Sequence, residues 1–196
     1  MISLPIWISG LLFALIHSLF AAESCKRLFY RLGMTPQRYR LLYSIFAVLL
    51  TLIWLFYIYQ LTDSPLYQVS GWLNWLLVLL QLSGLWIVLV SLKAFDTALF
   101  LGMKSMIDDK EPFHEHGIYR YIRHPMYSGF MLALFASPAQ SVNSLNLALY
   151  IALYFLIGSR FEEQRMIRMH PEYIDYRNRV SAFIPWKALF HKSDSS

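Results

Sequence analysis

Three long runs without charge limit the fold of this chain more than any other feature of its sequence. Residues 2–22, 41–61 and 72–92 are each 21 residues long and contain no Asp, Glu, Lys or Arg. A helix needs about 20 mostly apolar residues to cross the hydrocarbon core of a bilayer, and in lipid a helix satisfies its own backbone hydrogen bonds. The sequence therefore predicts three complete membrane-spanning helices.

A fourth uncharged region, residues 127–159, is too short for two complete crossings. It has 33 residues and is interrupted by Pro138, Asn143 and Asn146, whereas two full spans use roughly 40. We interpret it as a tight helical hairpin. With 57% hydrophobic and 15% charged residues, the chain is predicted to be an all-α integral membrane protein with about five transmembrane helices, the last two a short hairpin, followed by a cytoplasmic C-terminal helical segment.

The 17 Lys and Arg residues are confined to three segments, 26–40, 93–123 and 160–192. Loops on the cytoplasmic side of a membrane carry an excess of these residues. We therefore predict a multi-pass protein of the inner (cytoplasmic) membrane, with the N-terminus outside and the C-terminus in the cytoplasm. The formal charge of +5 then follows from topology. A nucleic-acid partner, which would need basic residues gathered on a soluble face, is not expected.

The segment 117–127, GIYRYIRHPMY, places charge and aromatic rings at the start of a membrane helix. Pro125 suits the first turn of a helix, so His124 is the expected cap. The free N–H groups of that helix start would lie beside Arg120 and Arg123 and form an anion site. Aromatic faces come from Tyr119, Tyr121 and Tyr127. The alternative is an ordinary aromatic and basic belt at the lipid headgroups.

Two adjacent carboxylates, Glu162 and Glu163, follow the hairpin and favour a binding site over a belt. One of them, which we take to be Glu162, is expected to bind an ammonium or a ribose diol. Glu163 is expected to be the solvated member that forms ion pairs along a cytoplasmic helix. A carboxylate, an anion site and aromatic faces together suit a zwitterionic nucleoside such as S-adenosylmethionine. His114 and His116 lack further ligand-type partners, so no metal site is expected.

GIYRYIRHPMY, followed by Arg-Glu-Glu-type charges and the segment EYIDY, resembles the membrane methyltransferases that include isoprenylcysteine carboxyl methyltransferase and phospholipid methyltransferases. The resemblance covers residues 113–185. The N-terminal half, with His17-Ser18 and Phe100-Leu101-Gly102, is similar to the bacterial branch that contains methanethiol S-methyltransferase and the nitrite-reduction-associated membrane proteins. The chain is thus similar to an integral membrane methyltransferase family.

The resemblance implies that S-adenosylmethionine lies between the hairpin's first helix and the cytoplasmic end of its second. Its expected contacts are Phe113, His114, Tyr119, His124, Pro125, Met126, Tyr127 and Glu162. In the prenylcysteine enzymes an arginine four residues before the cofactor-binding glutamate faces the substrate, and that position is Gly158 here. Arg160 is the candidate for orienting the acceptor, and a carboxylate acceptor is not expected.

We therefore predict methyl transfer from S-adenosylmethionine to a lipophilic, small apolar or thiol-type acceptor at the cytoplasmic membrane face. Direct displacement needs positioning and exclusion of water more than a protein nucleophile. The alternative functions are an NADPH-dependent membrane reductase of sterol-reductase-like design and a non-catalytic component linked to nitrogen-oxide metabolism.

Two further polar residues lie in or next to the predicted spans. For His17 we favour a structural role over a functional one, and for Asp96 we expect either an ion pair or a place at the substrate entrance.

One membrane methyltransferase domain is expected over residues 1–196. Residues 1–92 would supply three transmembrane helices. Residues 93–196 would supply the cofactor-binding loop, the helical hairpin and the C-terminal segment.

Overall fold

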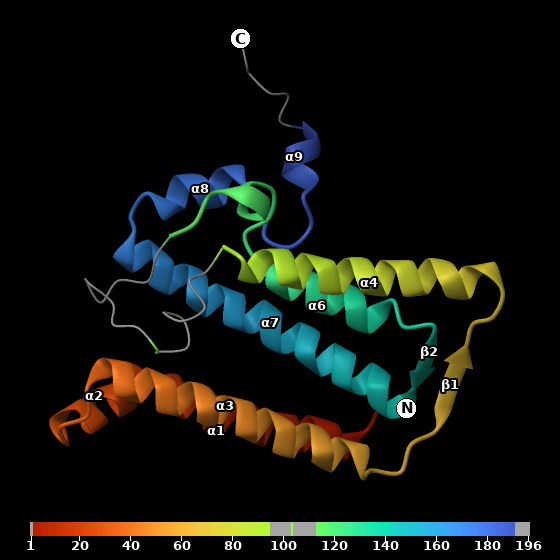
Figure 1. Ribbon diagram of the computed structural model, residues 1–196, viewed down its shortest axis with the longest axis horizontal. Coiled ribbons are helices and arrows are strands. Elements are labelled where there is room, and N and C mark those ends of the chain that lie inside the picture. The colour runs from red at the N-terminus through yellow and green to blue at the C-terminus, as the bar shows by residue number, and fades with distance from the viewer. Residues whose placement is uncertain (1, 95–102, 104–112, 191–196) are drawn as a thin grey trace. The chain divides into compact units, whose positions relative to one another are not determined.

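The computed structural model describes residues 2–94, 103 and 113–190, and the described chain is mostly helical. The helices are α1 (Leu4–Ala21), α2 (Glu23–Arg31), α3 (Pro36–Tyr59), α4 (Trp72–Leu92), α6 (Pro125–Phe135), α7 (Val142–Met169), α8 (Tyr173–Arg179) and α9 (Trp186–Phe190). A 3-10 turn, η1 (Gly117–Arg120), precedes α6, and the strands β1 (Pro65–Gln68) and β2 (Ala139–Ser141) form a small antiparallel pair. Figure 1 shows these elements along the chain.

Four helices, α1, α3, α4 and α7, are long and apolar enough to cross a membrane. This confirms an all-α membrane protein and the three predicted N-terminal spans. The predicted hairpin region is divided unequally, because α6 has 11 residues whereas α7 has 28 and continues past Ser159 to Met169. A fifth complete span therefore stays a prediction. Helix α3 begins before its uncharged run because the Thr35 side chain accepts a hydrogen bond from the Arg38 N–H and caps it.

Contacts divide the described chain into two compact units, and α7 runs from the first into the second. In the first unit, residues 2–68, 103 and 139–150, α1 packs against α3. The indole of Trp7 donates to Asn146 at 2.8 Å, and the Tyr150 hydroxyl donates to the Gly10 carbonyl. His17 lies 3.0 Å from the Tyr43 hydroxyl and stacks on Phe13. This packing favours the structural role for His17.

The second unit contains residues 69–94, 113–138 and 151–190. Its helices α4 and α6 lie side by side (Figure 1). Their backbones approach closely at two glycines, since a Cβ added to Gly84 would lie 2.6 Å from the Gly129 carbonyl oxygen. A buried cluster joins the last turns of α7 to α8 and consists of Met166, Tyr173, Tyr176 and Val180. The Tyr176 hydroxyl donates to the Tyr119 carbonyl at 2.6 Å, so this cluster also holds η1.

Candidate functional site

The candidate site lies within the second unit, where α6 begins. His124 is the cap residue and Pro125 the first helical residue, as predicted. Residues 122–124 pair with residues 181–182: Ile122 bridges Ser181, and the N–H groups of Arg123 and His124 each donate to a carbonyl at 2.9 Å. Pro125 has no N–H, and the N–H of His124 already donates to a carbonyl. The N–H groups at this helix start that have no intrahelical partner therefore belong to Met126 and Tyr127.

Glu163 is the buried carboxylate of the pair, with 4% of its surface exposed. Its Oε1 accepts from Nε of Arg123 at 2.8 Å, lies 2.7 Å from Nη2 of Arg123, and is 2.9 Å from Nε2 of His124. Nη1 of Arg123 also donates to the carbonyls of Arg177 and Val180. The expectation that Glu163 is the solvated carboxylate is wrong, because its position on α7 turns it toward the α6 start.

Arg123 is consequently occupied by the protein itself. Its guanidinium neutralises Glu163 and fastens α7 to the segment after α8, and its side chain is only 9% exposed. The predicted anion site therefore does not include the Arg123 side chain. Arg120, on η1, has an exposed side chain.

Glu162 is the accessible carboxylate, with 40% of its side chain exposed. Its Oε2 accepts a hydrogen bond from the Tyr127 hydroxyl at 3.0 Å and lies 3.8 Å from Nδ1 of His124. Three groups predicted to contact one cofactor, from two different helices, are thus brought together. The arrangement leaves a partly exposed negative charge near a helix start whose Met126 and Tyr127 N–H groups have no intrahelical partner.

The aromatic rings around this carboxylate are packed on one another. His124 stacks on Tyr127 at 5.5 Å between centroids and on Phe183 at 5.4 Å, and Tyr127 also stacks on Phe155 at 4.4 Å. The Tyr127 ring thus packs on His124 and Phe155, and its hydroxyl orients Glu162; the contact of this residue with the cofactor stays a prediction. Tyr121, the third tyrosine of the motif, is 53% exposed.

Phe113 and His114 lie on the segment that leads into η1, and Tyr119 lies in η1 itself. Phe113 packs against Tyr173 and Tyr176 in the buried cluster. Burial lowers the pKa of His114, and the nearby His116 adds to the effect. Burial raises the pKa of Tyr119, and the charge of Glu162 raises it further.

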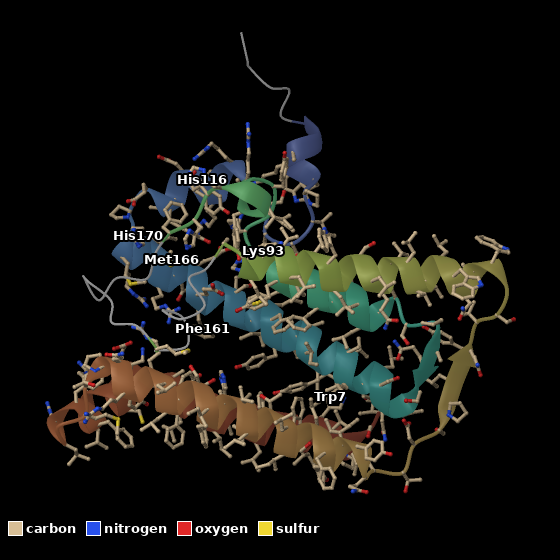
Figure 2. The ribbon with its side chains drawn as sticks, in the orientation of Figure 1. Trp7, Lys93, His116, Phe161, Met166 and His170 are labelled. Atoms are coloured by element: carbon tan, nitrogen blue, oxygen red, sulfur yellow. The ribbon has the colours of Figure 1, made fainter. Side chains whose placement is uncertain are left out.

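Arg160 is exposed and lies two residues before Glu162 on α7, whereas nothing lies within 4 Å of a Cβ built on Gly158. Figure 2 labels Phe161 and Met166 on the same helix, His170 just after its end, and His116 before η1. Phe161 is 67% exposed and Met166 is buried, so this part of α7 has a solvent or lipid side and a packed side. Asp96 and Phe100-Leu101-Gly102 lie outside the described residues.

Sequence reasoning missed the partners that hold the site together. The first is Glu163, the buried hydrogen-bond partner of His124. The others are the rings of Phe183 and Phe155, which stack on His124 and Tyr127, and Ser128, whose hydroxyl donates to the Phe183 carbonyl at 2.7 Å. One signal of a buried partner was present in the sequence. An arginine and a histidine stand directly before a helix start, and if their side chains are buried there they need a buried hydrogen-bond acceptor. The pairing of residues 122–124 with 181–182 had no local signal.

Comparison with known proteins places these residues in a family. The NnrU protein family model matches residues 6–136. The chain is 31% identical to methanethiol S-methyltransferase 2 of Bradyrhizobium diazoefficiens over 89% of this chain and 70% of the relative, and 30% identical to methanethiol S-methyltransferase of Pseudomonas deceptionensis over 89% and 69%.

A third relative matches a shorter stretch. Protein-S-isoprenylcysteine O-methyltransferase of Saccharomyces cerevisiae is 34% identical over 36% of this chain and 25% of the relative. No solved structure matches the chain. The family model covers more than half of the chain and the bacterial relatives most of it, so the chain belongs to the NnrU protein family of multi-pass membrane proteins, and its curated relatives are named as methyltransferases.

Proposed function

We propose that this protein is an S-adenosylmethionine-dependent methyltransferase that acts on a lipophilic or small thiol-type acceptor at the cytoplasmic face of the inner membrane. The observation that carries the proposal is the partly exposed Glu162 carboxylate, held by Tyr127 beside the open N–H groups of the α6 start. The names of the relatives support methyl transfer in general.

The donor set fits the charges of S-adenosylmethionine. Glu162 would accept hydrogen bonds from its ammonium or its ribose, and the N–H groups of Met126 and Tyr127 would bind its carboxylate. Pro125 fixes the start of α6, while Phe113, His114 and Tyr119 would line the cofactor's apolar and aromatic parts. When bound, the cofactor supplies a methyl group on a positively charged sulfur. The described residues contribute no protein nucleophile to this proposal, because a direct displacement needs none.

The NADPH-dependent reductase is less well supported by the same contacts. Arg123, the buried cation of the motif, is already neutralised by Glu163 and hydrogen-bonded to two carbonyls. A dinucleotide phosphate would have to be bound by the exposed Arg120 or Arg160 instead. A purely structural family member would not require a half-exposed carboxylate oriented by a tyrosine hydroxyl.

The proposed acceptor is a thiol or another uncharged small molecule. Two relatives are named as methanethiol methyltransferases. In addition, Gly158 stands at the position where the prenylcysteine enzymes have an arginine, so no cation is available there to bind a prenylcysteine carboxylate. We assign the exposed Arg160 to orienting the acceptor at the mouth of the site.

We expect the purified protein in detergent to transfer a labelled methyl group from S-adenosylmethionine to ethanethiol at least about ten times faster than to N-acetyl-farnesylcysteine. A cation that pairs with a carboxylate contributes on the order of 1.5 kcal/mol or more, which corresponds to this factor. Mass spectrometry of thioether and methyl ester products would measure both rates in one competition reaction. Efficient methyl-ester formation would overturn the assignment of the acceptor.

For the membrane topology we propose that residues 26–40, 93–123 and 160–196 face the cytoplasm and that 62–71 and the region of Gln140 face outside, because Lys and Arg are absent from the latter segments. Single cysteines introduced at the exposed positions 66 and 139 in a Cys25→Ser background should react with a membrane-impermeant maleimide in intact cells. Reaction of position 139 only after the membrane is opened would contradict this orientation.

A further inference from the structure

His124 lies between two carboxylates that differ in burial and in partners. Nε2 of the ring is 2.9 Å from Oε1 of the buried Glu163, and Nδ1 is 3.8 Å from Oε2 of the partly exposed Glu162. The ring itself is 5% exposed and is clamped by Tyr127 and Phe183. Its orientation is therefore fixed by packing against these two rings and by one short hydrogen bond.

The partners of Glu163 determine where the proton of His124 sits. The carboxylate is paired with the Arg123 guanidinium at 2.7 Å, so it is ionised and can only accept hydrogen bonds. Nε2 of His124 must then be the donor, and in the neutral ring the lone pair is left on Nδ1. Tyr127 does not satisfy that lone pair, because its hydroxyl donates to Glu162.

We propose that Nδ1 of His124 accepts the proton of the thiol acceptor during methyl transfer, and that Glu163 is the positioning residue that holds the ring in the required tautomer. The inference deepens the proposed function and rests on it. The acceptor's S–H bond breaks with its proton going to Nδ1, and the sulfur's electron pair forms the new bond to the methyl carbon. The electrons of the methyl group's former bond stay on the sulfonium sulfur and neutralise it.

A thiol needs such a base because the thiolate is the nucleophile. An ordinary cysteine-like thiol has a pKa of about 8.5 and is mostly protonated at neutral pH. A carboxylate–imidazole pair is a common means of removing a proton at that pH, since the carboxylate fixes the ring and stabilises the imidazolium that forms.

The test compares two thiols of different acidity with the same protein. Ethanethiol is protonated at neutral pH, whereas thiophenol is largely ionised and needs no base. In His124→Gln, whose amide N–H can still donate to Glu163, kcat/KM for ethanethiol should fall by about 100-fold or more. The value for thiophenol should fall by less than about tenfold, the margin allowed for altered binding. The ratio of the two values cancels any loss of cofactor affinity or of folded protein.

Glu163→Gln should change the same ratio in the same direction, because a neutral amide no longer imposes the Nε2–H tautomer. Nitrogen NMR of the wild-type protein in detergent, without any ligand, should show His124 protonated at Nε2 and bare at Nδ1. Glu172→Gln is the matched control: Glu172 also contacts a histidine, His170, but its side chain is 62% exposed, and its thiol ratio should equal that of the wild type.

Three outcomes separate the inference from the proposed function. Equal falls for both thiols in His124→Gln would overturn the base role and leave the methyltransferase proposal standing. A His124 ring protonated at Nδ1 in the wild type would overturn the role of Glu163. Wild-type protein that methylates neither thiol would overturn the proposed function and the base role with it.

Discussion

Glu163→Ala is expected to lower the stability of the protein in detergent by about 3–5 kcal/mol, the usual result of removing one partner of a buried ion pair. The side chain of Arg123 is 9% exposed, so its charge would remain buried without its carboxylate. The imidazole of His124 would lose its acceptor as well. For a chain of this size the melting temperature should fall by roughly 10 °C. Thermal unfolding followed by circular dichroism would measure it.

The control for this prediction is Glu172→Ala. That carboxylate also contacts a histidine, but it is exposed, and an exposed pair contributes less than about 1 kcal/mol. Its melting temperature should lie within about 2 °C of the wild type. Equal melting temperatures for Glu163→Ala and Glu172→Ala would show that the buried cluster of Arg123, His124 and Glu163 does not hold the α6 start.

Glu162→Ala is expected to have the opposite pattern of effects. Loss of charge-assisted hydrogen bonds to the cofactor should weaken S-adenosylmethionine binding by about 1.5–3 kcal/mol, or roughly 10- to 150-fold in Kd. Stability without cofactor should change little, because Glu162 is partly exposed and its one short hydrogen bond among the described residues is to the Tyr127 hydroxyl. Tyr127→Phe should reproduce a part of the loss, since it releases the carboxylate from its oriented position.

The contrast between the two glutamates shows where sequence reasoning succeeds. Charge at the end of an apolar run predicted a carboxylate site, and Pro125 predicted where α6 begins; both features are local and have direct physical causes. The three N-terminal spans could be predicted for the same reason, since the length of an uncharged run is read directly from the chain.

Which glutamate is buried could not be read from the same pattern. Glu162 and Glu163 are adjacent and identical, and on a helix their side chains point about 100° apart. Their roles therefore depend on which face of α7 meets the α6 start. That face is set by long-range contacts, among them the bonds from Arg123 and His124 to residues 177–182, which lie more than 50 positions away.

His124 illustrates the same limit for a single residue. The sequence predicted that it caps a helix and contacts a cofactor, but no local pattern indicated that its ring is packed. The structure confirms the cap but places the ring at 5% exposure against Tyr127 and Phe183. Replacing His124 should therefore affect the α6 start itself, which is why a ratio of two substrates is needed to isolate its chemical role.

Calorimetric titration of the purified protein with S-adenosylmethionine, in parallel with Glu162→Ala and with NADPH as the competing cofactor, tests the central claim most directly. We predict saturable binding of S-adenosylmethionine to the wild type, a Kd roughly 10- to 150-fold weaker for Glu162→Ala, and no binding of NADPH. Wild-type affinity in Glu162→Ala, or binding of NADPH in place of S-adenosylmethionine, would contradict the site and the function proposed for it.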